Sequence, residues 1–316
     1  MRFSVIIPLY NKAPYVAKAI ECVLSQTYTD FELVIVNDGS KDDSALIAQR
    51  TIEGHENCRL INQENAGVSV ARNKGVASSN GDYLCFLDSD DWWDSRFLES
   101  MSNFIEEYPK AGIYGTNYTI VNETRHKTCI APIGVDAGFK KGYINYCHVY
   151  AKTLTMPLWT GAVCVPRHVF DEVGGFNPQL RMGEDFDLWI RIAIKYKVAL
   201  LNEPLAFYNQ DVEVQNRAIG SLPPPITQFA FNTDYLNDEM EHDSELKNIV
   251  ECIQIICLRN YYLSKAYHKQ ADEVLRRLDL NPHLKHSYAD YLTRPVWLNR
   301  LLGRVAHMVQ KIKYGK

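Results

Sequence analysis

Short apolar runs alternate with amphipathic stretches through the first third of the chain. Five runs are typical of buried strands, at 3–9, 31–40, 58–63, 82–88 and 111–118. Three stretches between them space their apolar residues as helices do, at 15–26, 68–79 and 95–108. Strands buried on both faces and separated by helices predict an α/β fold with a mostly parallel sheet flanked by helices.

The pattern is less regular beyond residue 118. Polar and aromatic residues mix over 119–160, which predicts irregular structure or a hairpin. A strand is expected at 161–166, and 198–209 predicts two short strands around a turn. A helix is expected over 184–196, with these side chains directed at the core: Phe186, Trp189, Ile190, Ala193 and Ile194.

The stretch GSLPPPI at 220–226 is the best candidate for a domain boundary, because three successive prolines suit neither a helix nor a central strand. We expect a larger α/β domain at 1–219 and a smaller α-helical C-terminal region at 220–316. No apolar run reaches 18 residues, and the N-terminus lacks the features of a signal peptide, so no membrane-spanning helix is predicted.

The tail at 294–316 has a basic, amphipathic pattern. Residues 291–316 hold Lys and Arg but no acid, and one helical face carries Trp297, Leu301, Val305, Met308 and Ile312. Such a helix can lie on an anionic membrane surface. It can equally pack on its own domain with a solvated basic face, and the pattern leaves both interpretations open.

Composition narrows the class of protein. Of 316 residues 46% are hydrophobic, enough for a sizeable core, and the formal net charge of −4 argues against nucleic acid as a partner. Eight cysteines form no C-x-x-C pair, and several lie in apolar runs. This is typical of reduced, buried thiols, so a cytoplasmic protein is expected.

The stretch LCFLDSDDWWD at 84–94 carries the strongest chemical signal. Asp88 and Asp90 directly follow an apolar run, and carboxylate oxygens suit Mg²⁺ or Mn²⁺. An ion held there could bridge the protein to a diphosphate. The alternative is a solvated turn in which Asp94 or Ser95 caps the next helix.

Other strand ends carry weaker signals of the same kind. Asp38 could accept hydrogen bonds from a ribose or a base, although Asn-Asp-Gly-Ser also suits a plain turn. Asn65 and Arg72 could face a nucleotide or sugar, or be ordinary solvated groups. Glu184 and Asp185 begin a helix, where acids complement the helix dipole and could also supply a general base.

In order along the chain, five motifs resemble those of glycosyltransferase family 2, whose fold is the GT-A (Rossmann-like) fold. They are VIIPLYNK, VIVNDGSKDDS, NAGVSVARNKG, YLCFLDSDDWW and GEDFDLWIR, and the resemblance covers roughly residues 1–210. Five motifs in the same order are more specific than any one of them.

The resemblance implies a role for each matching residue. Asp185 would be the catalytic base with Glu184 beside it, and Asp90 with Asp88 would hold Mn²⁺ or Mg²⁺. The nucleotide sugar would lie among Pro8, Tyr10, Asp38, Asn65, Arg72, Asp88 and Ser89, with Asp38 on the uracil. The acceptor would lie near Trp159, Thr160 and Gly161.

The resemblance also implies the activity: an inverting, metal-dependent hexosyltransferase with a UDP-sugar donor. The acceptor would be a saccharide or lipid-linked saccharide in surface polysaccharide biosynthesis, which a tail on the inner face of the membrane would suit. The processive Q-x-x-R-W motif is missing. Two alternatives stay open. A sugar nucleotidyltransferase would need glycine in its N-terminal loop, and VIIPLYNKAP has none. A non-catalytic binding module could lose the D-S-D and E-D pairs freely, yet both are intact.

Overall fold

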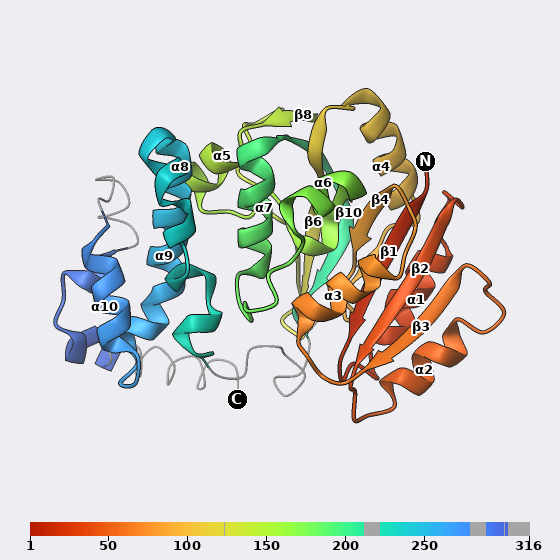
Figure 1. The fold of residues 1–316 in the computed structure, drawn as a ribbon, viewed down its shortest axis with the longest axis horizontal. Helices are drawn as coiled ribbons and strands as arrows, with labels where there is room; N and C mark the ends of the chain where they lie inside the picture. The colour runs from red at the N-terminus through yellow and green to blue at the C-terminus, as the bar shows by residue number, and fades with distance from the viewer. Residues whose placement is uncertain (123, 212–221, 279–288, 300, 303–316) are drawn as a thin grey trace. The chain divides into compact units, whose positions relative to one another are not determined.

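The computed structural model describes residues 1–122, 124–211, 222–278, 289–299 and 301–302 (Figure 1). The chain divides into two compact units, Met1–Gly220 and Ser221–Lys316, which are described one at a time. That the prolines mark a boundary between two domains, at 219/220, remains a prediction. The larger unit contains all the residues proposed above for the site.

One mixed sheet forms the centre of the larger unit. Its strands are β1 (Phe3–Leu9), β2 (Phe31–Asp38), β3 (Cys58–Gln63), β4 (Tyr83–Phe86), β5 (Trp92–Trp93), β6 (Ala111–Asn122), β7 (Lys127–Ile130), β8 (Lys141–Ile144), β9 (Val163–Pro166) and β10 (Lys197–Asn209). The order is β3-β2-β1-β4-β9-β6-β10-β5, with β7 on β6 and β8 on β10. The mostly parallel α/β sheet expected from the sequence is confirmed.

The parallel part of the sheet determines where the site forms. Strand β1 lies between β2 and β4, parallel to both, and β3 is parallel to β2. The carboxyl ends of these four strands therefore meet at one edge. The short β9 runs antiparallel between β4 and β6, and β6 and β10 form a second parallel pair.

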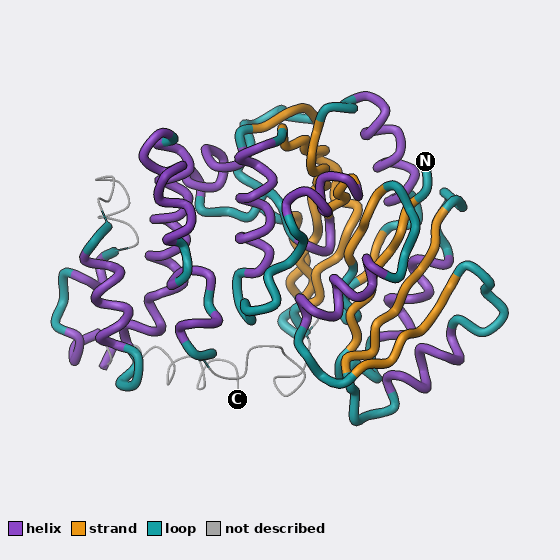
Figure 2. The backbone as a smooth tube through the Cα atoms, in the orientation of Figure 1, coloured by secondary structure: helices purple, strands orange, loops and turns teal. Residues whose placement is uncertain are grey.

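Helices cover both faces of the sheet (Figures 1 and 2). They are α1 (Val16–Leu24), α2 (Ser44–Thr51), α3 (Val68–Ala77), α4 (Phe97–Glu107), α5 (Tyr146–Thr153), α6 (Arg167–Val173) and α7 (Glu184–Lys195). Val5 and Ile7 of β1 share a core with Ile20 of α1. Ile6, whose side chain alternates to the other face, lies against Gly75 of α3, where an added Cβ would come within 2.4 Å of it.

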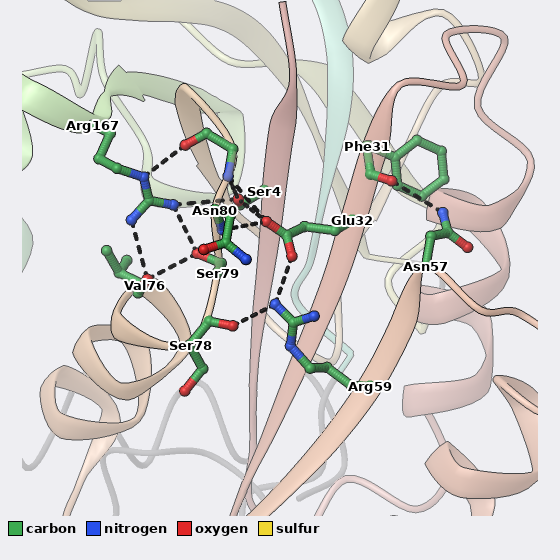
Figure 3. Close-up of polar contacts among 11 residues, drawn as sticks. Ser4, Phe31, Glu32, Asn57, Arg59, Val76, Ser78, Ser79, Asn80 and Arg167 are labelled. Carbon is green, nitrogen blue, oxygen red and sulfur yellow. Dashed lines mark hydrogen bonds and ion pairs between the residues drawn. The ribbon is translucent and has the colours of Figure 1, made fainter.

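A buried polar network ties the amino ends of the strands together (Figure 3). The Glu32 carboxylate, 1% exposed, accepts hydrogen bonds from the Ser4 hydroxyl and the Gly81 amide and pairs with Arg59. Arg167 at the start of α6 donates to the Gly81 carbonyl at 2.7 Å. The network lies at the amino end of β1 and β2, so the candidate site at the opposite end is built by other residues.

Three local expectations differ from the structure. Residues 198–209 belong to one strand, β10, because register shifts around Pro204 absorb the residue that cannot donate to the ladder. Ile194 is 40% exposed, while Ile192 fills the core face of α7. The segment 119–160 contains the expected hairpin, β6–β7, but also helix α5, which begins at an Asn145 cap.

The smaller unit is helical where it is described. It contains α8 (Asn237–His242), α9 (Ser244–Leu263), α10 (His268–Arg276) and four 3₁₀ turns, Pro225–Thr227, Phe229–Phe231, Asp234–Leu236 and Asp290–Leu292. Most of the tail expected to be amphipathic, 303–316, lies outside the described residues. Among the helices that the structure describes, none has the length and apolar character needed to cross a bilayer. None of the eight cysteines, which all lie among the described residues, forms a disulfide.

Candidate active site

Asp38, the last residue of β2, holds the loop that leads into α3. Its buried carboxylate accepts hydrogen bonds from the Ala66 amide at 2.8 Å, the Gly67 amide at 2.9 Å and the Gln63 side chain at 2.8 Å. Asn65, which is exposed, donates to the Asp38 carbonyl at 2.9 Å. Asp38 therefore fixes the loop, and its predicted contact with uracil would have to use the remaining acceptor capacity of this carboxylate.

The loop after β1 is bound to the loop after β2. Asn11 has a positive φ of 51°, its amide donates to the Ser40 hydroxyl, and its side chain accepts from the Lys41 amide. The Lys12 amide donates to the Ser44 hydroxyl at 2.7 Å. These bonds fix the backbone on both sides of the strand end and leave Tyr10 43% exposed.

Pro8 and Ser89 are less accessible than their predicted contacts with a nucleotide sugar suggest. Pro8 is buried within β1, opposite Val36 of β2. Ser89 is only 3% exposed. Both remain predictions as binding residues, since either could contact a ligand only through a small part of its surface.

The acidic turn after β4 is closed by the Asp91 amide, which donates to the Asp88 carbonyl at 3.0 Å. The Asp88 carboxylate, 32% exposed, pairs with Arg72 at 2.8 Å, and Asp90 pairs with Lys12 at 2.5 Å. Both aspartates of the predicted metal motif thus have a basic partner. Burial raises the pKa of Asp90, Lys12 opposes this, and the charge of Asp88 adds to it.

Asp91 has a structural role in the same turn. Its side chain is buried and accepts a hydrogen bond from the Asn209 amide at 2.7 Å, at the end of β10. Burial and the charges of Asp90 and Asp88 raise its pKa well above the ordinary value. Asp91 therefore joins the turn to the sheet edge.

Arg72 of α3 links the two acidic motifs. Its buried guanidinium donates to Asp88 at 2.8 Å and to Glu184 at 3.0 Å, across 112 positions of sequence. Burial opposes its charge, but the carboxylates of Asp88 and Glu184 outweigh burial and raise its pKa. The guanidinium also lies over the Phe176 ring, at 5.1 Å. This bridge brings the D-S-D turn and the start of α7 together.

Asp185, in the first turn of α7, has the electrostatics of a general base. Burial and the charge of Glu184 raise its pKa to about 7, while the Phe186 amide and Arg72 act in the opposite direction. The Phe186 amide donates to the Asp185 carboxylate at 2.8 Å. A carboxyl that is half ionised near neutral pH can both take and release a proton.

An aromatic cluster, Tyr118, Trp159 and Tyr208, lies beside Asp185. Trp159 packs on Tyr118 at 4.9 Å and on Tyr208 at 5.2 Å between ring centroids. The charge of Asp185 contributes to raising the pKa of Tyr118, although burial is the larger cause. Tyr208 is 37% exposed, while the other two rings are buried. The cluster leads from the candidate base to the surface.

The 3₁₀ turn η1 (Thr160–Ala162) packs against Trp159 of this cluster. Thr160 is 3% exposed, and a Cβ on Gly161 would come within 2.5 Å of the Trp159 ring. The Trp93 indole donates to the Gly161 carbonyl at 2.6 Å. In the structure Gly161 thus packs closely against Trp159, and the contact of Thr160 and Gly161 with an acceptor remains a prediction.

The carboxylate oxygens of the acidic turn suit a divalent cation that is bound together with a phosphate ligand. Among the described residues no cluster of three or more His, Cys, Asp or Glu is arranged to hold a metal. Mg²⁺ and its analogues commonly take one or two carboxylates and complete their shell with substrate phosphates and water. Asp88 and Asp90 fit that pattern, whereas a site made of protein ligands alone would not fit.

Two residues that contribute most to the geometry were understated or missed in the sequence. Lys12 was not singled out, although a lysine directly after the first strand faces an acidic turn at the neighbouring strand end. Arg72 was expected to line the nucleotide pocket, but in the structure it also pairs with Glu184. Among the other candidates, Asp88 and Asp185 interact electrostatically with Arg72, and Asp90 interacts with Asp88.

Comparison with known proteins gives a consistent result. The family model described as glycosyl transferase family 2 matches residues 4–145, and glycosyl transferase family group 2 matches 83–213. Glycosyltransferase GlyA of Streptococcus pneumoniae is 38% identical over 144 residues, 46% of this chain and 20% of GlyA. An uncharacterized glycosyltransferase of Rickettsia prowazekii, RP339, is 31% identical over 191 residues, 60% of this chain and 57% of its own.

The chain therefore spans only part of the length of these relatives. Among solved structures, S. aureus TarS 1-349 in complex with UDP-GlcNAc superposes with a TM-score of 0.62 at 18% identity, covering 95% of this chain and 80% of TarS 1-349. The mannosyltransferase PcManGT of Pyrobaculum calidifontis, in complex with GDP-Man and Mn²⁺, gives 0.58 at 18%, covering 98% and 87%. At that identity these structures support the GT-A fold.

Proposed function

Because this chain belongs to glycosyl transferase family 2, we propose that it is an inverting, metal-dependent hexosyltransferase. The donor is a nucleoside-diphosphate sugar, UDP-linked, and the acceptor is a hydroxyl of a saccharide or lipid-linked saccharide. Surface polysaccharide biosynthesis is the proposed setting. The UDP-GlcNAc bound to TarS and the Mn²⁺ and GDP-Man bound to PcManGT support the donor class and the metal.

One observation carries the proposal: Arg72 joins the carboxylate of the D-S-D turn to that of the E-D pair. One terminal nitrogen of this guanidinium binds a carboxylate of the proposed metal motif and the other binds the neighbour of the proposed base, which supports a single site. A sugar nucleotidyltransferase has no need of this second acidic pair. A pure binding module would not need a half-ionised Asp185.

The proposed chemistry assigns a separate task to each side of the bridge. Asp185 takes the proton of the acceptor hydroxyl, which then attacks the anomeric carbon of the donor. A divalent ion at Asp88 and Asp90 would neutralise the diphosphate as it leaves. Displacement from the opposite face in one step inverts the anomeric centre, so an α-linked donor gives a β-linked product.

The aromatic cluster is proposed to receive the acceptor. Tyr208 offers an exposed ring next to buried Trp159, and Tyr118 links that surface to Asp185. Aromatic faces bind the apolar face of a pyranose ring and leave its hydroxyls free for polar contacts. This arrangement supports a saccharide acceptor over a purely aliphatic alcohol.

Turnover of a panel of UDP-sugars with Mn²⁺ and simple saccharide acceptors tests this function, and its pH profile tests the base. Below the Asp185 pKa of about 7 the base is protonated, so kcat/KM is expected to fall by about tenfold per pH unit there. Besides Glu184 and Arg72, Tyr118 and Tyr146 interact electrostatically with this carboxyl, and neither ionises near neutral pH.

The stereochemistry of the product provides the control for this experiment. Proton NMR of the first product should give a β-linked sugar from an α-linked donor. A retained anomeric centre would contradict the single displacement. A flat profile between pH 5 and 8 would remove Asp185 as the base, because its ionisation would not limit the reaction.

A further inference from the structure

Lys12 contacts Asp90 in a shielded ion pair that the proposed reaction does not explain. The Lys12 ammonium lies 2.5 Å from an Asp90 carboxylate oxygen, and the two side chains are 13% and 17% exposed. The Coulomb attraction within a pair so shielded from water is screened less than in a surface ion pair. Lys12 therefore binds one of the two carboxylates that would hold the metal.

The backbone of Lys12 is fixed, and its side chain is the part that can move. Its amide donates to the Ser44 hydroxyl at 2.7 Å, and the next amide, of Ala13, donates to Asp42 at 3.1 Å. On the other side Asn11 is bound to Ser40 and Lys41. The ammonium is carried on a flexible four-carbon chain, so it can change partners without any change in this loop.

A metal and the ammonium would compete for this carboxylate, because both are cations. A divalent cation would approach Asp90 to about 2.0–2.2 Å, the distance typical of Mg²⁺ and similar ions. The ammonium, at 2.5 Å from the same side chain, would then lie beside a doubly charged ion and be repelled by it. The diphosphate that arrives with the metal would supply the new anion within reach of Lys12.

Arg72 differs from Lys12 in this respect. Its guanidinium is held by both Asp88 and Glu184 and by the Phe176 ring, so it has a second carboxylate when a metal engages Asp88. Lys12 instead binds Asp90, a carboxylate that a metal at the D-S-D turn would also need. A metal there would therefore compete directly with Lys12 for Asp90.

We propose that Lys12 is an exchangeable cation of the donor site, bound to Asp90 without metal and bound to the donor diphosphate once metal and nucleotide enter. The inference rests on the proposed function, since it requires a metal–diphosphate ligand. The exchange predicts that Lys12 has opposite effects on two binding affinities. Lys12 competes with the metal alone, and it favours the metal–nucleotide complex.

Replacing the lysine with methionine, Lys12→Met, separates these effects. Without the competing ammonium, the affinity for Mn²⁺ alone should rise by roughly tenfold, measured by the loss of the free-ion EPR signal during titration. Without the diphosphate contact, the affinity for UDP at saturating Mn²⁺ should fall by roughly tenfold, measured by calorimetry. Lys12→Arg should restore UDP binding, because it keeps the positive charge.

Lys41→Met is the matched control. Lys41 lies in the adjoining loop and is exposed, and its side chain makes no hydrogen bond or ion pair in the part of the chain that is described. Lys41→Met removes the same charge from this neighbouring loop. A general electrostatic effect would therefore change the Mn²⁺ and UDP affinities of both variants alike. Circular dichroism and the melting temperature show that each variant is folded before binding is compared.

The outcomes distinguish this inference from the function on which it rests. Opposite changes in Mn²⁺ and UDP affinity for Lys12→Met, absent in Lys41→Met, support the exchange. If the wild type binds UDP with Mn²⁺ but Lys12→Met changes neither affinity, or changes both in the same direction, the exchange is wrong and the function stands. If the wild type binds no nucleotide with Mn²⁺, both are overturned.

Discussion

Asp185→Asn is expected to lower turnover of a UDP-sugar by about 10²- to 10⁴-fold, the contribution of a general base. Asparagine has the same shape and can still accept the hydrogen bond that the Phe186 amide donates at 2.8 Å. It cannot accept the acceptor proton. Binding of UDP with Mn²⁺ should remain nearly unchanged, since the proposed metal ligands are Asp88 and Asp90, and the Asp88–Arg72 pair is left intact.

The measurement is kcat for donor turnover beside calorimetric binding of UDP with Mn²⁺. Asp171→Asn provides the control, because Asp171 is an exposed acid of α6 outside the site. Full turnover by Asp185→Asn would assign the base to another group. Loss of UDP binding as well would indicate that Asp185 acts on donor binding rather than on the acceptor.

Arg72→Met is expected to destabilise the fold by about 3–5 kcal/mol, because removing one partner of a buried ionic network leaves the others unpaired. Arg72 is 3% exposed and holds both Asp88 and Glu184. Donor turnover should also be lost, since the two acidic motifs would repel each other. Urea unfolding and the turnover assay check the two effects.

A lysine at position 72 keeps the charge but cannot offer two arms of a planar fork, so Arg72→Lys should recover only part of the stability. Arg96→Met is the matched control. Arg96 pairs with Asp94 on the surface with a side chain 60% exposed, and its loss should cost no more than about 1 kcal/mol. Equal stability of Arg72→Met and the wild type would mean that the bridge does not hold the site together.

From the sequence, the proximity of candidate residues could be predicted where they lie at the ends of neighbouring parallel strands. Asp38 ends β2 and Asp88 follows β4, both parallel to β1, so their place at one edge of the sheet follows from the alternation of strands and helices. Asp185 was singled out through its motif, at the start of a strong amphipathic helix. In the structure the start of that helix contacts Arg72, because Glu184 pairs with its guanidinium.

What the sequence could not predict are pairings between distant residues. Lys12 meets Asp90 across 78 positions and Arg72 meets Glu184 across 112, and no local pattern specifies either partner. The sequence left Asp38 open between a ligand acceptor and a plain turn, because its three donors lie 25 to 29 positions later. The single strand β10 was read as two because Pro204 interrupts its pattern, while the ladder bypasses it with bulges.

Calorimetric titration of UDP, with and without Mn²⁺ and with GDP in parallel, tests the central claim most directly. If the D-S-D turn holds a metal on a nucleoside diphosphate, UDP should bind with Mn²⁺ and bind far more weakly without it. GDP should bind less well than UDP if the donor is UDP-linked. Equal binding of UDP with and without Mn²⁺, or no binding of either nucleotide, would contradict a metal-dependent nucleotide-sugar site at Asp88 and Asp90.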